Sequence, residues 1–293
     1  MTRTNPISRW PIRRFAPLAL LLLACALAWP MAARAQIAAG IEVNVTPPPL
    51  PAYAEPPLPA DGYIFTPGYW AWGPSGYYWV PGTWVQPPAP GLYWTPGYWA
   101  LAPDGNGYVW YAGYWGPSVG FYGGVDYGFG YYGSGYYGGY WEGGFFFYNS
   151  EVHNFGRVHV DHVYGRDVPR VSGQRVSFSG AARGGVDARP NEDETHAASE
   201  PHTPPHTLQV QHETQAGSLH SAPLAVNHGY PPVAATQHPA TFTGHGIVSA
   251  KPPAPAPHPA PAPHPAPAPH PAGGPPPQNH GGPPPGPGGP DHH

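Results

Sequence analysis

The chain has 293 residues, of which 41% are hydrophobic and 10% are charged, with 48 prolines, 40 glycines and one cysteine. Five of the twelve basic residues precede residue 36, which leaves seven basic against sixteen acidic residues, a formal charge of −9, beyond that point. One cysteine excludes a disulfide-stapled scaffold, and the absence of Lys, Arg and His from residues 36–150 excludes the cationic track that nucleic-acid binding requires.

The first 35 residues have the layout of a secretory signal peptide. A basic leader precedes an apolar run, residues 15–29, which is shorter than the ~20 residues of a membrane span, and an A-x-A cleavage site ends at Ala35. Cleavage there predicts an exported chain in the periplasm or at the cell surface, with no transmembrane helix. A second interpretation stays open, because residues 22–25 resemble a lipobox that would anchor the chain through a lipid on Cys25.

Residues 36–60 are rich in proline, which fixes the backbone in extended conformations. This composition predicts a linker of polyproline II character, a spacer that contributes nothing to a core.

The next segment, residues 61–116, contains a duplicated unit. Residues 66–71 and 95–100 both read TPGYWA, and each copy continues into a turn and the pattern Tyr-x-Trp-x-x-Gly-x-Trp. Within the unit a shorter module, aromatic-x-Pro-Gly-x-Trp, occurs at residues 65–70, 79–84 and 94–99, and, with Ala in place of Pro, at 110–115. Duplication at a fixed offset predicts that the two copies stack and bury a shared face.

This repeat segment is predicted to be all-β. Tyr, Trp, Val and Thr favour pleated surfaces, and turn residues at 73–76 and 103–107 place hairpins at residues 68–84 and 97–115. The fold class is therefore a small aromatic-rich antiparallel meander of about four short bent strands, followed by a Gly/Tyr-rich segment and a long disordered Pro/His-rich tail. Because proline breaks a strand, the module glycines are predicted to form bulges with positive φ. These are Gly68, Gly82, Gly97 and Gly113.

The modules resemble the WXXGXW repeat, also written YXWGXW, of exported bacterial proteins. The resemblance extends into the Gly/Tyr stretch, the aromatic run 145–148 and residues 177–180. Members of that family mostly have no assigned function, so the resemblance implies export and repeat architecture and supplies no catalytic residues.

Alternation along a strand places neighbouring rings such as Tyr69 and Trp70 on opposite faces, so both faces of the predicted sheet are aromatic. Two interpretations remain open. The rings form a core, as most aromatic stripes do, or one face forms an exposed platform that stacks on sugar rings or on a partner protein. The candidate platform residues are Tyr69, Trp70, Trp84, Tyr98, Trp99, Tyr114 and Trp115.

Residues 117–150 are rich in glycine and tyrosine, a composition typical of irregular, adhesive segments, so self-association is plausible. Gly128, Gly130 and Gly133 match the spelling of a dinucleotide-binding loop, but no βαβ context surrounds them. No cofactor is expected.

The chain is not expected to be an enzyme. Asp104, Asp126 and Glu142 are the carboxylates of the aromatic region, but Asp104 occupies a turn sequence, and every histidine lies beyond Ser150.

The histidines after residue 150 include one cluster with metal-binding potential. His159, Asp161 and His162 form an H-x-D-H sequence with His153 nearby, for which a solvated loop is favoured over a metal site.

The remaining chain divides into a polar, valine-containing segment, residues 151–190, with possible edge strands, and a disordered His/Pro/Ala-rich tail, residues 191–293. Within the tail, residues 191–198 are compatible with the start of a helix capped by Asn191, but such a helix is marginal without a packed face. His258, His264 and His270 recur every six residues, too far apart in an extended chain to share one ion.

Together these features predict a non-enzymatic cell-envelope protein with a structural or interaction role. The alternative is a polysaccharide- or peptidoglycan-binding module. Either function is carried by the aromatic repeats.

Overall fold

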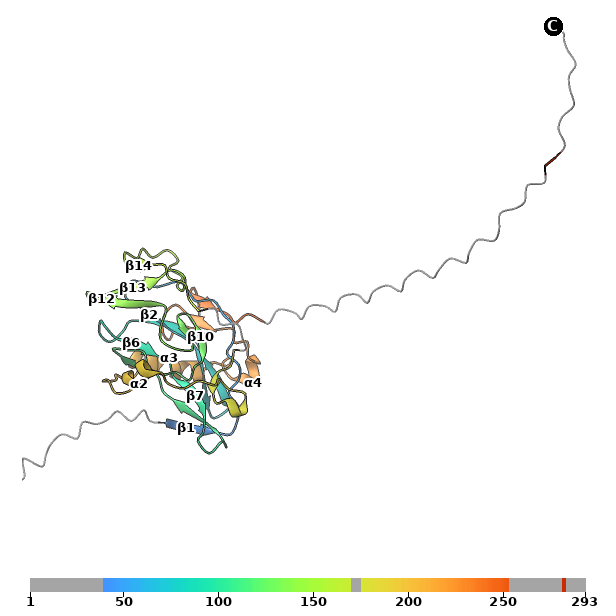
Figure 1. Ribbon diagram of the computed structural model, residues 1–293, viewed down its shortest axis with the longest axis horizontal. Coiled ribbons are helices and arrows are strands. Elements are labelled where there is room, and N and C mark those ends of the chain that lie inside the picture. Colours follow the sequence, from blue (N-terminus) through green and yellow to red (C-terminus); the bar gives the residue numbers. More distant parts are fainter. Residues whose placement is uncertain (1–38, 170–174, 253–280, 283–293) are drawn as a thin grey trace, which may run out of the picture. The chain divides into compact units, whose positions relative to one another are not determined.

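The computed structural model describes residues 39–169, 175–252 and 281–282 (Figure 1). The predicted signal peptide, Cys25 and the tail histidines from His258 onward lie outside these residues. Contacts divide the chain into one compact unit that ends at Pro252 and a second unit beyond it.

The first repeat is one antiparallel hairpin that is interrupted in both legs. Its outer arm pairs β2 (Ile64–Thr66) with β5 (Gly82–Val85), and its inner arm pairs β3 (Tyr69–Gly73) with β4 (Gly76–Val80). The interruptions fall at the prolines of the two modules, because proline has no N–H to donate to the ladder.

The second repeat has the same construction. Its outer arm pairs β6 (Tyr93–Thr95) with β9 (Tyr114–Gly116), and its inner arm pairs β7 (Tyr98–Leu101) with β8 (Tyr108–Tyr111). The predicted β class and both predicted hairpins are confirmed. Each predicted bent strand is, however, two short strands.

The four module glycines lie where the two legs of each hairpin approach most closely. A Cβ at Gly97 would lie 2.7 Å from the backbone nitrogen of Gly113, and one at Gly68 would lie 2.8 Å from that of Gly82. None of the four has a positive φ, so the prediction of left-handed bulges is wrong. Glycine is needed there because there is no room for a side chain, and backbone strain has no part in it.

The aromatic residues at the two ends of each module pair across the strands. The ring centroids of each pair are 5.1 to 5.4 Å apart, at tilted or edge-to-face angles. The four pairs are Phe65–Trp84, Trp70–Trp79, Trp94–Trp115 and Trp99–Trp110. The module spacing thus places the close approach of the two hairpin legs, at the module glycines, between two aromatic pairs.

The two repeats stack, and other segments cover the ends of the stack. The Trp99 indole of the second repeat donates a 2.8 Å hydrogen bond to the carbonyl of its counterpart, Trp70. Trp70 in turn donates to the carbonyl of Pro49 at 3.1 Å. On the second repeat, β1 (Ala39–Val43) pairs with β8, and β15 (Phe178–Ser179) pairs in parallel with β7. These flanking strands act as the capping elements that a repeat stack requires.

The proline-rich segment packs into the core, so its prediction as a spacer is wrong over residues 39–60. Leu50, Tyr53 and Leu58 are buried, and Trp84 donates to the carbonyl of Pro56 at 2.9 Å. An extended proline-rich backbone loses little entropy on ordering, and its carbonyls face no competing intrachain ladder. They are therefore available as acceptors for the indole N–H groups.

The Gly/Tyr-rich segment is also ordered. It contains the small ladder of β10 (Asp126–Gly128) and β11 (Tyr131–Tyr132), and a longer hairpin of β12 (Gly139–Glu142) and β13 (Phe145–Asn149). The parallel strand β14 (Val163–Tyr164) borders β13. Hydroxyls of this segment bind the second repeat: Tyr131 donates to the carbonyl of Trp94 at 2.9 Å, and Tyr127 to that of Gly97 at 2.6 Å.

The prediction of a disordered tail is wrong over residues 191–252. This stretch follows the short 3-10 helix η1 (Ala181–Arg183) and contains three helices and two strands. They are α2 (Glu192–Ala197), α3 (Thr207–Gly217), α4 (Leu224–Asn227), β16 (Ala235–Thr236) and β17 (Ile247–Val248). The start of α2 is as predicted, with Asn191 as N-cap.

The repeats hold this C-terminal segment in place. Strand β16 pairs in parallel with β5, and the Trp79 indole donates to the carbonyl of Ala234 at 3.0 Å. Docking on a preformed aromatic surface supplies the stabilisation that the polar sequence lacks on its own.

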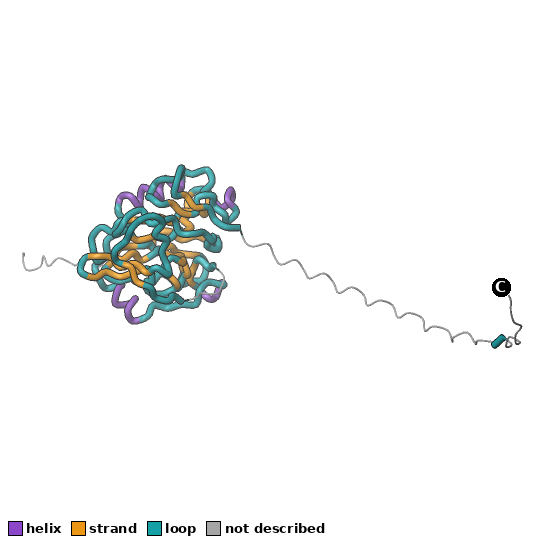
Figure 2. The backbone as a smooth tube through the Cα atoms, turned by 90° about the horizontal axis from the view of Figure 1, so that it is seen from above, coloured by secondary structure: helices purple, strands orange, loops and turns teal. Residues whose placement is uncertain are grey.

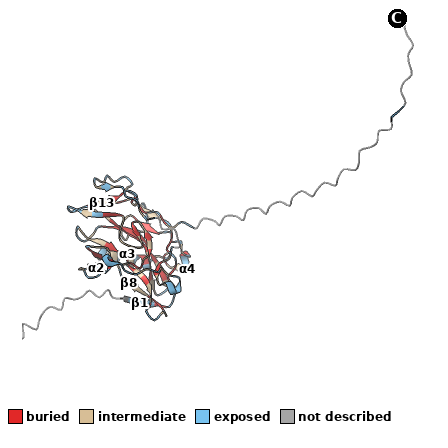
Figure 3. Ribbon diagram, in the orientation of Figure 1, coloured by how far each residue is buried: buried red, intermediate tan, exposed pale blue. Residues whose placement is uncertain are grey.

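The helices lie at the periphery of the strands (Figure 2). Buried residues gather in the interior, and much of the rim is exposed (Figure 3). In the part of the chain that the structure describes, no helix has the length and apolar character that a membrane crossing would need.

Candidate functional site

The tryptophans of the predicted platform belong to the core. Trp70, Trp84, Trp99 and Trp115 are each at most 2% exposed, and Tyr114 is 8% exposed. Every one of these four indoles donates a hydrogen bond inside the protein; that of Trp115 goes to Oε1 of Gln209 at 2.8 Å. The prediction of an exposed tryptophan platform is therefore wrong, and the core interpretation of these rings holds.

The opposite face of the repeats carries partly buried rings. Tyr69 stacks across the repeats on Trp110, the cross-strand partner of Trp99, with ring centroids 5.0 Å apart and an interplanar angle of 18°. Within the second repeat, Tyr98 stacks on Tyr111 at 5.0 Å and 9°. The C-terminal helices cover this face. Two grooves remain between the rings and the helices.

The two grooves occupy matching positions in the two repeats. The first groove lies against both repeats, since it is also lined by Trp94, Gly97, Trp110, Ala112 and Gly113. From matching positions, residues 66, 67, 69, 80, 81 and 83 line the first, and residues 95, 96, 98, 111, 112 and 114 line the second. These sets correspond at offsets of 29 residues before the hairpin turn and 31 after it. A helix residue, Glu213 from α3 or Glu194 from α2, contributes a carboxylate to each groove.

The first groove has a volume of only about 70 Å³, because α3 fills it. His212 is 3% exposed; its Nε2 donates to the carbonyl of Pro81 at 2.8 Å, and its Nδ1 accepts from the amide of Ala240 at 2.8 Å. Burial lowers the pKa of His212 to about 4, because the charged imidazolium would lose its hydration. Burial also raises the pKa of Glu213. Both groups fix the helix on the repeat and leave little space for a ligand.

The second groove has a volume of about 250 Å³. Beyond the repeat residues it is lined by Phe121, whose ring meets Tyr98 edge to face at 5.5 Å, and by Glu194. Burial foremost, and then the neighbouring Tyr111, Tyr114 and Glu194, raise the pKa of Tyr98, so its hydroxyl stays protonated.

A third aromatic surface is exposed on the sheet of β12, β13 and β14, and we call it the hairpin surface. It consists of Tyr140, Phe145, Phe147, His162 and Tyr164. Tyr140 stacks on Phe147 at 5.0 Å and 9°, and Phe145 stacks on His162 at 4.7 Å and 21°. Phe145 is 57% exposed and Tyr140 39% exposed. The three strands lie together at one edge of the folded unit (Figure 1).

A shallow groove of about 230 Å³ borders the hairpin surface. Trp141 and Phe145 form its aromatic side, and Asp61 and Gln86 provide a carboxylate and an amide. Trp141 is fixed there, because its indole donates to the carbonyl of Leu92 at 3.1 Å. The groove combines flat rings with groups that can form hydrogen bonds.

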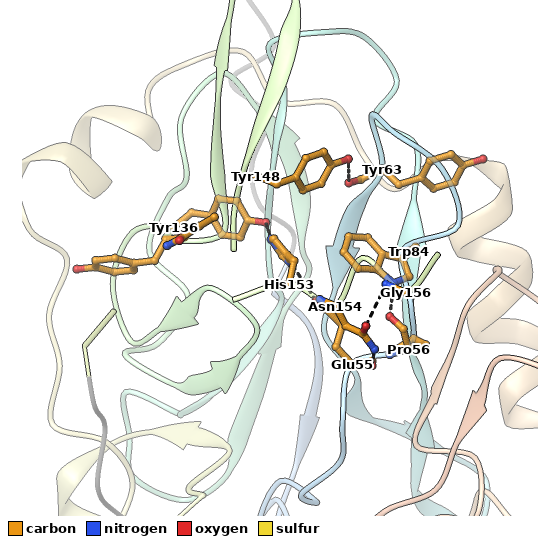
Figure 4. A network of polar contacts seen from close by, with 11 residues as sticks. Glu55, Pro56, Tyr63, Trp84, Tyr136, Tyr148, His153, Asn154 and Gly156 are labelled. Atoms are coloured by element: carbon orange, nitrogen blue, oxygen red, sulfur yellow. Dashed lines mark hydrogen bonds and ion pairs between the residues drawn. The ribbon is translucent and has the colours of Figure 1, made fainter. Parts of the chain in front are cut away.

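A buried polar network ties the proline-rich segment to the Gly/Tyr-rich segment (Figure 4). Glu55 accepts from the amide of Asn154 and contacts His153 Nδ1, both at 2.9 Å, and the Tyr136 hydroxyl lies 3.3 Å from His153 Nε2. The side chain of His153 is fully buried and that of Glu55 is 4% exposed. A substrate cannot reach these groups, so the network is structural.

The carboxylates that were considered for catalysis are not assembled into a site. Asp104 accepts from the amide of Asn106 in its turn, which lowers the pKa of Asp104, and Asp126 accepts from the amide of Gly128. Glu142 is exposed at the end of β12. No hydrogen bond or ion pair joins any two of the three among the described residues.

The H-x-D-H sequence forms an exposed pair. His159 Nε2 lies 3.0 Å from a carboxylate oxygen of Asp161, and both side chains are more than three-quarters exposed. His162 stacks on Phe145. In the ranges that the structure describes, no three ligating side chains gather as they would around a metal ion.

Sequence reasoning did not identify the hairpin surface or the second groove. The aromatic run 145–148 indicated the former, but the pairing that exposes Phe145 and buries Phe146 depends on β14. The second groove depends on α2, which lies in a segment with the composition of a disordered tail. No sequence pattern connects these segments.

A search of curated proteins found no match to the chain, and a search of solved structures found none either. A family model matches at residues 61–85 and 93–115, which are the two interrupted hairpins. The resemblance seen in the sequence is thereby confirmed over these residues, and the chain carries two copies of the WXXGXW repeat.

Proposed function

We propose that this chain is a non-enzymatic, exported cell-envelope protein with a structural or interaction role. The repeats form its scaffold, and the hairpin surface makes its contacts. The observation that carries the proposal is the division of the aromatic residues into two sets. Four repeat tryptophans are buried with their indoles hydrogen-bonded internally, namely Trp70, Trp84, Trp99 and Trp115, whereas Tyr140 and Phe145 are exposed on a separate sheet.

Exposure of large rings on one surface favours a contact function. Isolated exposed apolar side chains are ordinary, but a contiguous set of stacked rings at the edge of a sheet is typical of interaction sites. The rigid hairpin reduces the entropy lost on binding.

One donor at the β12 edge is not available for strand addition from another chain. The amide of Trp141 donates to the Tyr93 hydroxyl at 3.0 Å, so this edge donor is already occupied. Contact through the hairpin surface is therefore made by side chains.

Polysaccharide binding is the second candidate function, and the groove beside the hairpin surface favours it. Sugar rings stack on flat aromatic faces, and Asp61 and Gln86 can pair with sugar hydroxyls. No Lys, Arg or His occurs in residues 36–150, so a neutral polymer is expected, with little dependence on salt.

The test compares the purified protein with a Tyr140→Ala, Phe145→Ala double variant. Binding is measured by co-sedimentation with peptidoglycan and with neutral exopolysaccharide, and self-association by analytical ultracentrifugation. Tyr230→Ala is the matched control, because Tyr230 is 45% exposed and is not part of the hairpin surface.

Loss of self-association in the double variant alone supports the proposal. Loss of binding to peptidoglycan or exopolysaccharide in that variant alone selects the second candidate. If the double variant and the control behave like the unmodified protein in every assay, the hairpin surface is not the contact site.

A further inference from the structure

The second groove differs from the first at the positions that decide its chemistry. Val80 and Thr83 of the first repeat correspond to Tyr111 and Tyr114 of the second. The second groove therefore has four aromatic rings, those of Tyr98, Tyr111, Tyr114 and Phe121, and more than three times the volume of the first.

Glu194 gives this groove a buried carboxyl group. It is 3% exposed, and its two oxygens accept from the Ser134 hydroxyl and the amide of Asn191, both at 3.0 Å. Among the described residues no basic side chain forms an ion pair with it, and none lines the groove. A buried carboxylate without a cationic partner favours the binding of a positive charge nearby.

Both threonine hydroxyls of the groove are already engaged. Thr95 accepts from the amide of Gly120 at 2.9 Å, and the Thr195 hydroxyl donates to the carbonyl of Asn191 at 2.7 Å. The rest of the lining is dominated by aromatic rings and one carboxylate, and neither requires a hydrogen bond from the ligand.

We propose that the second groove binds a small organic cation of the quaternary ammonium class. Methylated ammonium groups have no N–H donors, and the negative faces of aromatic rings attract them. The volume of about 250 Å³ accommodates such a headgroup, whereas the first groove, at about 70 Å³, does not. The two repeats thus share a scaffold and differ in ligand binding.

The test titrates the full-length protein with choline and with its neutral isostere 3,3-dimethyl-1-butanol, using isothermal titration calorimetry. Choline is expected to bind saturably and about tenfold more tightly than the alcohol, because shape and apolar area are shared and only the charge differs. Equal affinities would show a merely apolar cavity, and no saturable choline binding would show that no site exists.

Two variants locate the site. Glu194→Gln keeps a side-chain oxygen for the helix cap but removes the charge, so choline affinity should fall about tenfold while the alcohol is unaffected. Tyr111→Val introduces the residue found at the corresponding position of the first repeat, Val80, and should also abolish the preference for choline over the neutral alcohol. Tyr230→Val is the control for loss of a surface ring.

Unchanged choline affinity in both variants would overturn the proposal. Circular dichroism confirms that each variant is folded. The hairpin surface is not involved, so this proposal and the proposed contact function can fail independently.

Discussion

Substitution of Gly97 by alanine tests the packing that the repeat motif specifies. The added Cβ would lie 2.5 Å from Cζ2 of Trp110, 2.7 Å from the amide nitrogen of Gly113 and 2.8 Å from the carbonyl oxygen of Tyr111. Two of these atoms are backbone, so the hairpin legs must separate by about 0.7 Å to restore ordinary contact at 3.4 Å. Overpacking of this kind costs about 3 kcal/mol, and valine, with two further methyl groups, should cost more.

The measurement is chemical and thermal unfolding of the variant against the unmodified protein. A loss of about 3 kcal/mol lowers the folding equilibrium constant roughly 150-fold and the melting temperature by about 6–12 °C for a fold of this size. Gly73→Ala is the control: Gly73 lies in the first hairpin, has no positive φ and faces only the Tyr78 ring at 3.2 Å. Equal stability of the Gly97 and Gly73 variants would refute the close crossing of the hairpin legs.

Three further outcomes follow from buried polar contacts. Because the pKa of His212 is lowered to about 4 in the folded protein, the unfolded state binds the proton first as the pH falls from 6.5 to 4. The free energy of unfolding should therefore drop by about 3 kcal/mol over that range. His212→Gln should remove this pH dependence, as measured by urea unfolding at each pH. Trp99→Phe leaves the carbonyl of Trp70 without its indole donor and should cost about 1–3 kcal/mol in thermal unfolding, whereas Trp72→Phe should stay within about 0.5 kcal/mol. Glu55→Ala removes an acceptor from the buried network and should accelerate limited proteolysis of the proline-rich segment; an unchanged digestion rate would show that the network does not hold that segment.

The repeats were predictable from the sequence because their information is local. Pro-Gly breaks, turn residues and alternating aromatics define each hairpin without reference to the rest of the chain. The requirement for glycine at Gly97 was also visible, but its cause was not. A close crossing of two backbones requires glycine, and so does a residue with positive φ, so the sequence alone does not distinguish these two causes.

The ordered flanks could not be predicted, because their stability comes from partners distant in sequence. Residues 191–252 lack an apolar face of their own, and α3 is fixed by contacts such as that of His212 with the carbonyl of Pro81, 131 residues away. The same holds for the proline-rich segment, whose carbonyls accept from indoles of the repeats. Composition describes what a segment can do alone, and both segments fold only on the aromatic repeats.

Alternation likewise left open which ring of each adjacent pair lies in the core. Tyr69 and Trp70 are both large and aromatic, and which of them is buried depends on the segments that cover each face. Trp70 faces the proline-rich segment and donates to the carbonyl of Pro49, whereas Tyr69 faces α3. The candidate platform therefore combined rings of both faces, and of the adjacent pairs Trp70 and Trp99 are buried whereas Tyr69 and Tyr98 are only partly buried.

Hydrogen exchange of the indole N–H groups, followed by nuclear magnetic resonance, tests most directly whether the repeat tryptophans form a closed scaffold. The indoles of Trp70, Trp84, Trp99 and Trp115 should remain protonated long after transfer to deuterium oxide, because each is buried and hydrogen-bonded. The partly exposed Trp72, whose indole has no partner among the described residues, should exchange at once. Immediate exchange of all five signals would contradict a buried tryptophan scaffold and restore the exposed platform.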